Sequence, residues 1–251
     1  MRPRLCSKPD ERRIIMTTDR SGIPFSKRLT DVAIGSGALL LLGPVMLAVA
    51  ALVKLASKGP ALYVARRAGY QGRPFGQLKF RTMHLGADRQ GSVTAKDDPR
   101  VFPLGRVLRL FKLDELPQIL NVLRGEMSVV GPRPEDVDVV RDCYTAEQRQ
   151  ILDVPPGLTC LPEVRFFPDF TVIDTGGMDP QQHYRQVLLP MRLDMDLEYL
   201  RTRSFWLDLR LIFHTAYLVL VQSWKILIFG QEIRSLPSGR SRVAGAGTER
   251  C

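Results

Sequence analysis

The most informative stretch of this chain runs from Leu113 to Pro134 and reads LDELPQILNVLRGEMSVVGPRP. Two adjacent carboxylates, Asp114 and Glu115, stand just before Pro117. Proline is tolerated in the first turn of a helix but not in its interior, so we predict a helix over about 117–123 with both acids at its N-terminus. The positive end of a helix dipole stabilises carboxylates and attracts phosphate, which suits phosphate chemistry.

Two interpretations of this acidic pair are open. In the structural one, Asp114 is an N-cap and Glu115 a first-turn glutamate. In the functional one, the pair belongs to an active site. Cations crowd around the two acids in greater number than a stable helix end needs, and this favours the functional interpretation. These cations are Arg106, Arg109, Lys112, Arg124 and Arg133.

The same stretch resembles the core signature of bacterial sugar transferases, the monotopic phosphoglycosyl transferases. The similarity lies in Leu-Asp-Glu-Leu-Pro-Gln, then Asn-Val-Leu-x-Gly, then Met-Ser-x-Val-Gly-Pro-Arg-Pro, and it covers roughly residues 25 to 225. Further matching segments are Gly59-Pro60, Arg67, Gly69, Gly72 to Phe75, Lys79 to Met83, Pro156 to Thr159, and Asp196 to Asp208.

This resemblance implies an enzyme that transfers a sugar-1-phosphate from a nucleotide sugar, with UDP expected, to a polyprenyl phosphate at the membrane. Nucleoside monophosphate would be released and synthesis of a surface glycan or exopolysaccharide initiated. The resemblance further implies that Asp114 is the nucleophile that forms a covalent phosphosugar intermediate. Glu115 would assist metal binding and proton handling, with Asp114 and Glu115 both holding Mg²⁺. The implied phosphate-binding residues are Lys79, Arg81, Arg109 and Arg133.

Two rival functions remain. One is a catalytically silent, membrane-anchored scaffold of the same fold that binds nucleotide sugar or a partner. It gives no reason to keep both Asp114 and Glu115 among so many cations, so the intact pair favours the enzyme. The other is a basic membrane-surface protein, which accounts for the charge of the chain but leaves the signature unexplained.

Composition agrees with this class of enzyme without naming it. The chain has 251 residues, enough for one large domain or two small ones, and 36 basic against 26 acidic residues give a formal net charge of +10. This charge suits an anionic membrane surface or a phosphorylated substrate. Nucleic acid is not expected as a partner, since acids interrupt the basic residues throughout and no zinc-finger or RNA-binding signature occurs. The four cysteines and three histidines show no metal-binding spacing.

An apolar run of 22 uncharged residues extends from Val32 to Val53 and is long enough to cross a bilayer as a helix. Two features favour a re-entrant helix over a spanning one. Pro44 in the middle of the run predicts a break in the helix. Basic residues flank the run on both sides, among them Lys27 and Lys54, and the positive-inside rule would keep both ends in the cytoplasm. The expected location is the cytoplasmic face of a bacterial inner membrane.

These features predict an α+β fold that is mainly helical with a small β-hairpin. The hairpin is expected from residues 61–64 and 75–80, and further helices near 145–152, 180–201 and 206–229. The last of these is apolar around most of its circumference, so it lies either in the membrane interface or in the core, and both remain open. The expected division is a mobile basic tail (1–24), a re-entrant membrane helix (25–58), a catalytic domain (59–230) and a second mobile tail (231–251).

The chain departs from the usual family pattern at two places. Ala65 stands where members usually have Gln, and Cys160 to Val164 replaces the usual Gly-Trp-Ala-Gln-Val. The second change removes an aromatic ring and an amide and adds a carboxylate, so one wall of the site should be altered. An unusual loop is also expected from Phe166 to Gly177. The sequence does not specify the sugar, the nucleotide, the glycan pathway or the oligomeric state.

Overall fold

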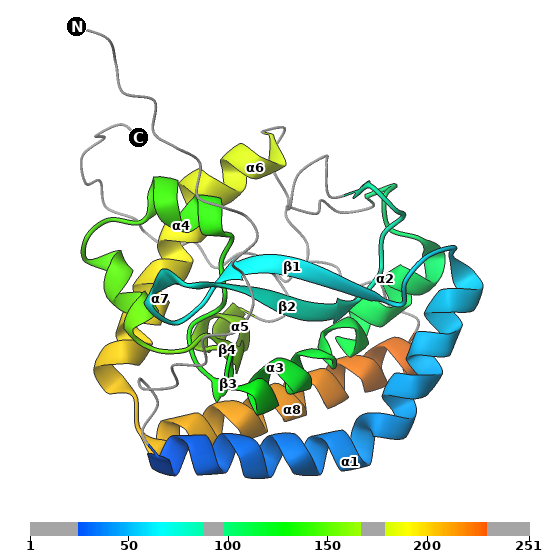
Figure 1. Cartoon of the computed structure of the whole chain (residues 1–251), viewed down its shortest axis with the longest axis horizontal. Helices are drawn as coiled ribbons and strands as arrows, with labels where there is room; N and C mark the ends of the chain where they lie inside the picture. The colour runs from blue at the N-terminus through cyan, green and yellow to red at the C-terminus, as the bar shows by residue number, and fades with distance from the viewer. Residues whose placement is uncertain (1–24, 88–97, 167–178, 230–251) are drawn as a thin grey trace, which may run out of the picture.

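In the computed structural model, which describes residues 25–87, 98–166 and 179–229, the chain is mainly helical with two small sheets (Figure 1). This confirms the predicted mainly helical α+β class. The two predicted tails, and the predicted loop beyond Phe166, lie outside the described residues. The elements in chain order are α1 (Phe25–Ala56), β1 (Leu62–Ala68), η1 (Tyr70–Gly72), β2 (Pro74–Phe80), α2 (Pro103–Leu110), η3 (Leu113–Glu115), α3 (Gln118–Arg124), β3 (Ser128–Val130), α4 (Val137–Cys143), η4 (Gln148–Asp153), β4 (Gly157–Thr159), α5 (Leu161–Phe166), α6 (Pro180–His183), η6 (Tyr184–Leu188), α7 (Leu189–Thr202) and α8 (Phe205–Phe229).

The predicted hairpin is present. Strands β1 and β2 pair antiparallel from Leu62 opposite Phe80 to Ala68 opposite Pro74, so the hairpin is longer than predicted. Gly72, at a left-handed φ of 71°, lies in the connection, where a side chain would be strained. The second sheet, a parallel pair of β3 and β4, was not predicted. Each of its strands has only three residues, which is too short for a strand periodicity.

The predicted helices are also present, with small changes. The helix expected near 117–123 is α3, the segment near 145–152 forms the short 3-10 helix η4, and 206–229 is α8. The helix expected over 180–201 is α6 and α7 joined by η6, a single π-helical segment. The structure adds three short helices that were not predicted, α2, α4 and α5.

Helix α1 continues for 32 residues although Pro44 lies inside it. Figure 1 shows α1 running along one edge of the molecule beside α8 and then turning upward. A proline inside a helix removes a backbone hydrogen bond and clashes with the preceding turn, so we attribute the bend to Pro44. The predicted break is therefore a bend within one continuous helix.

The N-terminal end of α1 is tied to the body of the protein by polar contacts. Lys27 forms an ion pair with Asp208 of α8 at 2.5 Å. Arg28 donates hydrogen bonds of 2.6 and 2.7 Å to the last carbonyls of α3. The buried carboxylate of Asp31 accepts hydrogen bonds from the hydroxyl of Ser128 (3.0 Å) and the N–H of Val129 (2.9 Å), at the start of β3.

The C-terminal end of α1 is tied to the same body. Val49 and Val53 are buried in a cluster with Phe80, Phe102 and Leu108, from β2 and α2. Both ends of the apolar helix are therefore fixed to one folded unit.

Within the described ranges, α1 is the one helix long and apolar enough to cross a membrane. Many of its apolar side chains are exposed, as are several on α8 and two on α2. One side of α8 nevertheless packs into the core through Leu211. The other side leaves large apolar residues exposed. The exposed apolar residues are Phe25, Leu29, Leu40, Leu41, Val45, Leu47, Leu52 and Leu55 on α1, Val107 and Leu110 on α2, and Phe205, Trp206, Phe213, Tyr217 and Leu220 on α8.

Candidate active site

The two acids lie where the sequence placed them, immediately before α3. They form the 3-10 turn η3, which follows α2 after a left-handed residue, Lys112 at φ 56°. A lysine in this conformation costs energy and persists only where the surrounding structure imposes it. Asp114 is buried and Glu115 is half-buried.

Helix α3 is held against β2 by two buried amides. Asn121, fully buried, accepts a hydrogen bond from the N–H of Leu78 at 2.9 Å and donates one to the carbonyl of Gly76 at 2.8 Å. Gln118 accepts a hydrogen bond from the side chain of Gln77 at 3.0 Å. These contacts fix the acidic turn relative to the strand that carries Lys79. Sequence reasoning quoted Asn121 within the signature but did not assign it this role.

Lys79 forms an ion pair with Glu115 at 2.9 Å, the shortest link between the hairpin and the acidic turn. Burial opposes ionisation of Glu115, but the charges of Lys79, Lys112 and Arg133 outweigh it and hold the pKa of this carboxyl well below its ordinary value. The pKa of Asp114 moves the other way, because burial and the neighbouring Glu115 charge raise it against the charges of Lys79, Lys112 and Arg109. Two adjacent carboxyls with oppositely shifted pKa values are suited to different roles.

Three further cations surround the acids. Arg109 donates from Nε to the hydroxyl of Thr82 at 2.9 Å, and its charge acts on Asp114. The charges of Lys112 and Arg133 both lower the pKa of Glu115. Of the five cations noted in the sequence, the structure brings these three together, while Arg106 and Arg124 are exposed.

Arg81, predicted to bind phosphate, is occupied elsewhere. Its guanidinium donates to the hydroxyl and carbonyl of Ser57, both at 2.8 Å, and to the carbonyl of Pro60 at 2.7 Å. It also lies over the ring of Phe102. Arg81 is 5% exposed, and it donates hydrogen bonds to acceptors of Ser57, the residue that follows α1. The geometry therefore gives Arg81 a structural task and offers no support for its predicted phosphate contact.

A carboxylate that sequence reasoning did not assign lies among the cations. Glu163, in the first turn of α5, forms an ion pair with Arg133 and lies 3.7 Å from the ammonium of Lys112. It belongs to the segment from Cys160 to Val164 that departs from the usual family pattern. That departure therefore places an added negative charge directly on the predicted phosphate-binding residue Arg133.

The backbone that carries Arg133, the turn from Gly131 to Pro134, is packed without room for side chains. A Cβ on Gly131 would lie 2.6 Å from the carbonyl oxygen of Pro155, and a Cβ on Gly157 would lie 2.1 Å from the nitrogen of Gly131. Any substitution at either glycine must push the two segments apart. The close approach packs the arginine turn against the start of β4.

A buried ionic network follows this turn and holds it from the other side. Glu135 pairs with Arg192 of α7 at 2.6 Å and lies 3.6 Å from Arg67 of β1, which also pairs with Asp136 at 2.8 Å. The hydroxyl of Tyr184 donates to the carboxylate of Glu135. Helix α7, strand β1 and the arginine turn are thereby locked together.

Asp196, on α7, is 1% exposed, and neither of its oxygens accepts a hydrogen bond of ordinary geometry within the described residues. Burial raises its pKa to about 7, against the charges of Arg192 and Arg133. A carboxyl in this environment favours its neutral form. A buried carboxyl with a raised pKa therefore lies beside the charges of Arg192 and Arg133.

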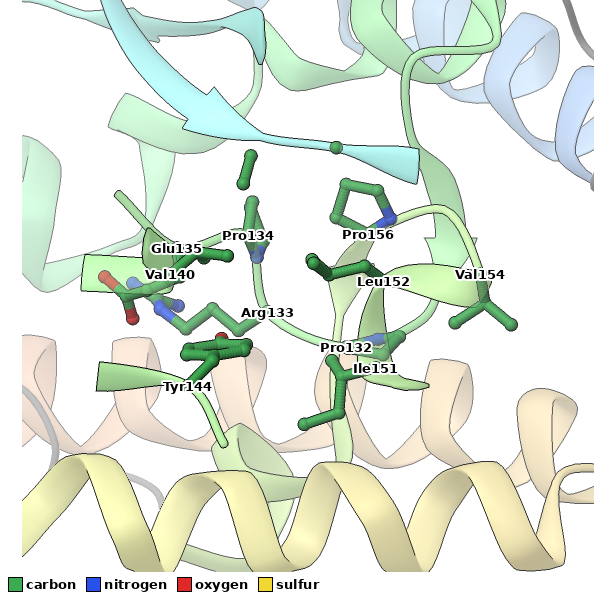
Figure 2. Close-up of a pocket in the computed structure, with 12 residues that line it drawn as sticks. Pro132, Arg133, Pro134, Glu135, Val140, Tyr144, Ile151, Leu152, Val154 and Pro156 are labelled. Atoms are coloured by element: carbon green, nitrogen blue, oxygen red, sulfur yellow. The ribbon is translucent and has the colours of Figure 1, made fainter. Parts of the chain in front are cut away.

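A small pocket lies next to the arginine turn but apart from the acids. Figure 2 shows Pro134, Pro156, Leu152 and Tyr144 around it. Arg133 belongs to both the pocket and the charged cluster, whereas Asp114 and Glu115 do not line the pocket. Its lining is mainly apolar, so this pocket does not provide the charged groups that surround the acidic turn.

The acidic pair fits the needs of Mg²⁺ only in part. Within 25–87, 98–166 and 179–229, no group of three or more His, Cys, Asp or Glu side chains is placed to hold a metal ion. Asp114 and Glu115 supply two adjacent carboxylates, and Mg²⁺ in phosphate chemistry is commonly bound by one or two carboxylates, with substrate phosphates and water completing its shell. The residues therefore fit a metal that arrives with its phosphorylated substrate.

Comparison with known proteins agrees with this arrangement. The family model described as bacterial sugar transferase matches residues 23–222. A UDP-glucose:undecaprenyl-phosphate glucose-1-phosphate transferase of Caulobacter vibrioides is 39% identical over 201 residues, covering 78% of this chain and 70% of the relative. The exopolysaccharide production protein ExoY of Sinorhizobium fredii is 38% identical over 207 residues, covering 76% of this chain and 84% of the relative.

Some relatives are much longer. A UDP-glucose:undecaprenyl-phosphate glucose-1-phosphate transferase of Klebsiella pneumoniae is 38% identical over 194 residues, and the match spans 76% of this chain but 39% of that protein. The part of this chain that matches the family model, residues 23–222, contains the acidic turn, the hairpin and the arginine turn. The chain belongs to the bacterial sugar transferase family of enzymes.

Proposed function

We propose that this protein transfers a sugar-1-phosphate from a nucleotide sugar, with a UDP-sugar expected, to a polyprenyl phosphate. The product would serve the synthesis of an exopolysaccharide or another surface glycan. The observation that carries the proposal is the buried acid Asp114 beside an ionised Glu115, within a ring of cations that can hold phosphate oxygens. The name of one relative includes UDP-glucose and undecaprenyl phosphate, which supports a UDP-sugar as the donor and a polyprenyl phosphate as the acceptor.

The proposed reaction has two displacements. In the first, a carboxylate oxygen of Asp114 attacks the phosphorus that bears the sugar, and the bond from that phosphorus to the nucleoside monophosphate breaks. In the second, a phosphate oxygen of the polyprenyl phosphate attacks the same phosphorus, and the aspartate is released. Arg109, Lys112 and Arg133 would neutralise the phosphate oxygens. The charge of Lys79 favours the ionised form of Glu115.

Mg²⁺ is part of the proposal, with Asp114 and Glu115 as its protein ligands. When bound, the ion would neutralise diphosphate charge that otherwise repels an approaching carboxylate. The protein would orient that carboxylate through η3 and the hydrogen bonds of α3 to β2. We also propose that Glu115, the neighbour of the nucleophile, takes part in proton handling in the second step.

We further propose that α1 enters and leaves the same leaflet at the cytoplasmic face of the inner membrane. A straight helix of this length would separate its ends by more than the roughly 30 Å hydrocarbon layer. Instead, Lys27 and Asp31 at one end and Val53 at the other contact the same folded body. The exposed leucines between these ends would meet lipid, and the adjacent exposed residues of α2 and α8 would meet the membrane surface.

The proposed function is tested by presenting the purified protein with a panel of nucleotide sugars and polyprenyl phosphate. At least one sugar nucleotide should release its nucleoside monophosphate and yield a lipid-linked sugar diphosphate. Excess chelator should reduce this release to background, and Mg²⁺ should restore it. If no nucleotide sugar in the panel releases its nucleoside monophosphate, the scaffold function is favoured. Full activity in excess chelator would remove Mg²⁺ from the mechanism.

The topology is tested with single cysteines in a variant that lacks Cys6, Cys143, Cys160 and Cys251. The first cysteine, Ser21→Cys, precedes α1 in the sequence, and the second, Lys58→Cys, follows it. Neither should react with a membrane-impermeant thiol reagent in intact cells, and both should react after permeabilisation. Pro44→Ala, which restores the missing helix hydrogen bond, should expose part of the Ser21→Cys population. Labelling of either site in intact cells without that change would establish a spanning helix.

A further inference from the structure

We propose that Glu163 is an internal competitor for phosphate: in the substrate-free protein its carboxylate occupies the anion subsite formed by Arg133 and Lys112, and a phosphate of the substrate displaces it. This inference rests on the proposed function and deepens it. It names the subsite that one substrate phosphate uses and the residue that sets the affinity there.

The geometry of this cluster is that of an anion bound by two cations. One oxygen of Glu163, Oε1, pairs with Arg133 and also lies 3.7 Å from the ammonium of Lys112. The three side chains come from three separate segments, the arginine turn, the residue before η3, and α5. A guanidinium and an ammonium that converge on one oxygen are a common arrangement for binding phosphate.

The cluster is joined to the reaction centre. Lys112 and Arg133, which hold Glu163, also help Lys79 to lower the pKa of Glu115. A phosphate that bound both cations would therefore lie close to the acidic pair. The bound carboxylate of Glu163 and such a phosphate cannot take the same donors at the same time.

The cluster also has the means to exchange one anion for another. The side chains of Arg133 and Lys112 are 32% and 21% exposed, and that of Glu163 is 15% exposed, so ligand and solvent can reach them. A phosphate group offers more negative charge and more acceptor oxygens than a carboxylate, and arginine binds it through two parallel hydrogen bonds. Glu163 would then turn toward solvent.

The opposite role for Glu163 is a permanent clamp that orients Arg133 for the substrate. The two roles predict opposite effects of Glu163→Gln, which keeps the size of the side chain and removes its charge. If Glu163 competes, the substrate no longer has to displace an ion pair and binds more tightly. If Glu163 orients Arg133, the arginine loses its support and the substrate binds more weakly or reacts more slowly.

The direct test is calorimetric binding of inorganic pyrophosphate to the wild-type protein and to Glu163→Gln. Competition predicts a Kd about tenfold lower in the variant, a change equivalent to about 1.4 kcal/mol. Steady-state assays of the full reaction should then show which phosphate uses the subsite. KM should fall for the nucleotide sugar if its diphosphate binds there, or for the polyprenyl phosphate if the lipid phosphate does, with kcat little changed.

Glu198→Gln is the matched control. Glu198, on α7, forms an exposed ion pair at 2.7 Å with Arg165 of α5, the helix that carries Glu163. This variant should leave pyrophosphate affinity and both KM values unchanged. An unchanged or raised Kd in Glu163→Gln, with a thermal unfolding temperature equal to that of the wild type, would overturn the proposal. Because the pyrophosphate arm needs no turnover, it separates this failure from a failure of the proposed transfer reaction.

Discussion

Replacement of Asp114 by asparagine is expected to lower the rate of nucleoside monophosphate release by about 1,000-fold or more. The amide is nearly the same size as the carboxylate, but it is neither a nucleophile nor a good ligand for Mg²⁺. Because the neutral amide also removes a buried like charge from beside Glu115, the fold should be kept. The rate is measured under conditions that saturate the wild-type protein, with thermal unfolding as the check on folding.

Asp138→Asn is the control for this substitution, since Asp138 is an exposed residue of α4 that pairs with Arg141 at 2.8 Å. It should retain full activity. A covalent intermediate gives a second measurement. Wild-type protein given nucleotide sugar without lipid acceptor should gain the mass of one sugar phosphate on the peptide that contains Asp114, and Asp114→Asn should not. Activity above a few per cent in Asp114→Asn would exclude this residue as the nucleophile.

The second large effect is expected on stability, at Asp196. Its pKa is about 7 in the folded protein and close to the model-peptide value of 3.8 when unfolded, so between these values the folded state binds the extra proton. The free energy of unfolding therefore falls as pH rises through this window, by about 4 kcal/mol in full and roughly 2 to 3 kcal/mol between pH 5 and pH 8. Asp196→Asn should remove this contribution.

This prediction is checked by denaturant unfolding of both proteins in detergent at pH 5 and pH 8. Other groups titrate over the same range, so the quantity of interest is the stability of Asp196→Asn relative to the wild type at each pH. That difference should move in favour of the variant as pH rises. Asp194→Asn, an exposed neighbour on the same helix, should show a difference that does not vary with pH. If the stability of Asp196→Asn relative to the wild type is also the same at pH 5 and pH 8, Asp196 is ionised in the folded protein at both pH values and the prediction is wrong.

The elements that the sequence predicted well carry strong local signals. Pro117 fixes the start of α3 and with it the place of Asp114 and Glu115. Pro44 marks the place where α1 bends, although the helix does not break there, and the glycines near Gly72 predict the hairpin that presents Lys79. Each signal depends on a residue with unusual backbone properties, so it can be recognised without knowledge of distant contacts.

The parts that could not be predicted depend on contacts between distant segments. Glu163 meets Arg133 from thirty residues away, and no local pattern records that pairing. Lys79 and Arg81 were both predicted to bind phosphate because of the resemblance to the family. Residues two apart in a strand share a face, but strand β2 ends at Phe80, so Arg81 does not follow that alternation and contacts the segment after α1 instead. The left-handed backbone of Lys112 is likewise imposed by the fold.

The π-helical segment from Tyr184 to Leu188 has a consequence for the spacing of the residues around it. Tyr184 and Arg192 are eight residues apart, and in a regular α-helix eight steps of about 100° would leave them about 80° out of phase around the axis. Four of these steps lie in the wider π-helix, which turns only about 82° per residue. The total is then close to two full rotations, so the tyrosine ring and the guanidinium come into line, 5.6 Å apart. Deleting one residue between them would rotate Tyr184 away from both Arg192 and Glu135. The number of residues between Tyr184 and Arg192 therefore has to stay the same if the two side chains are to face each other.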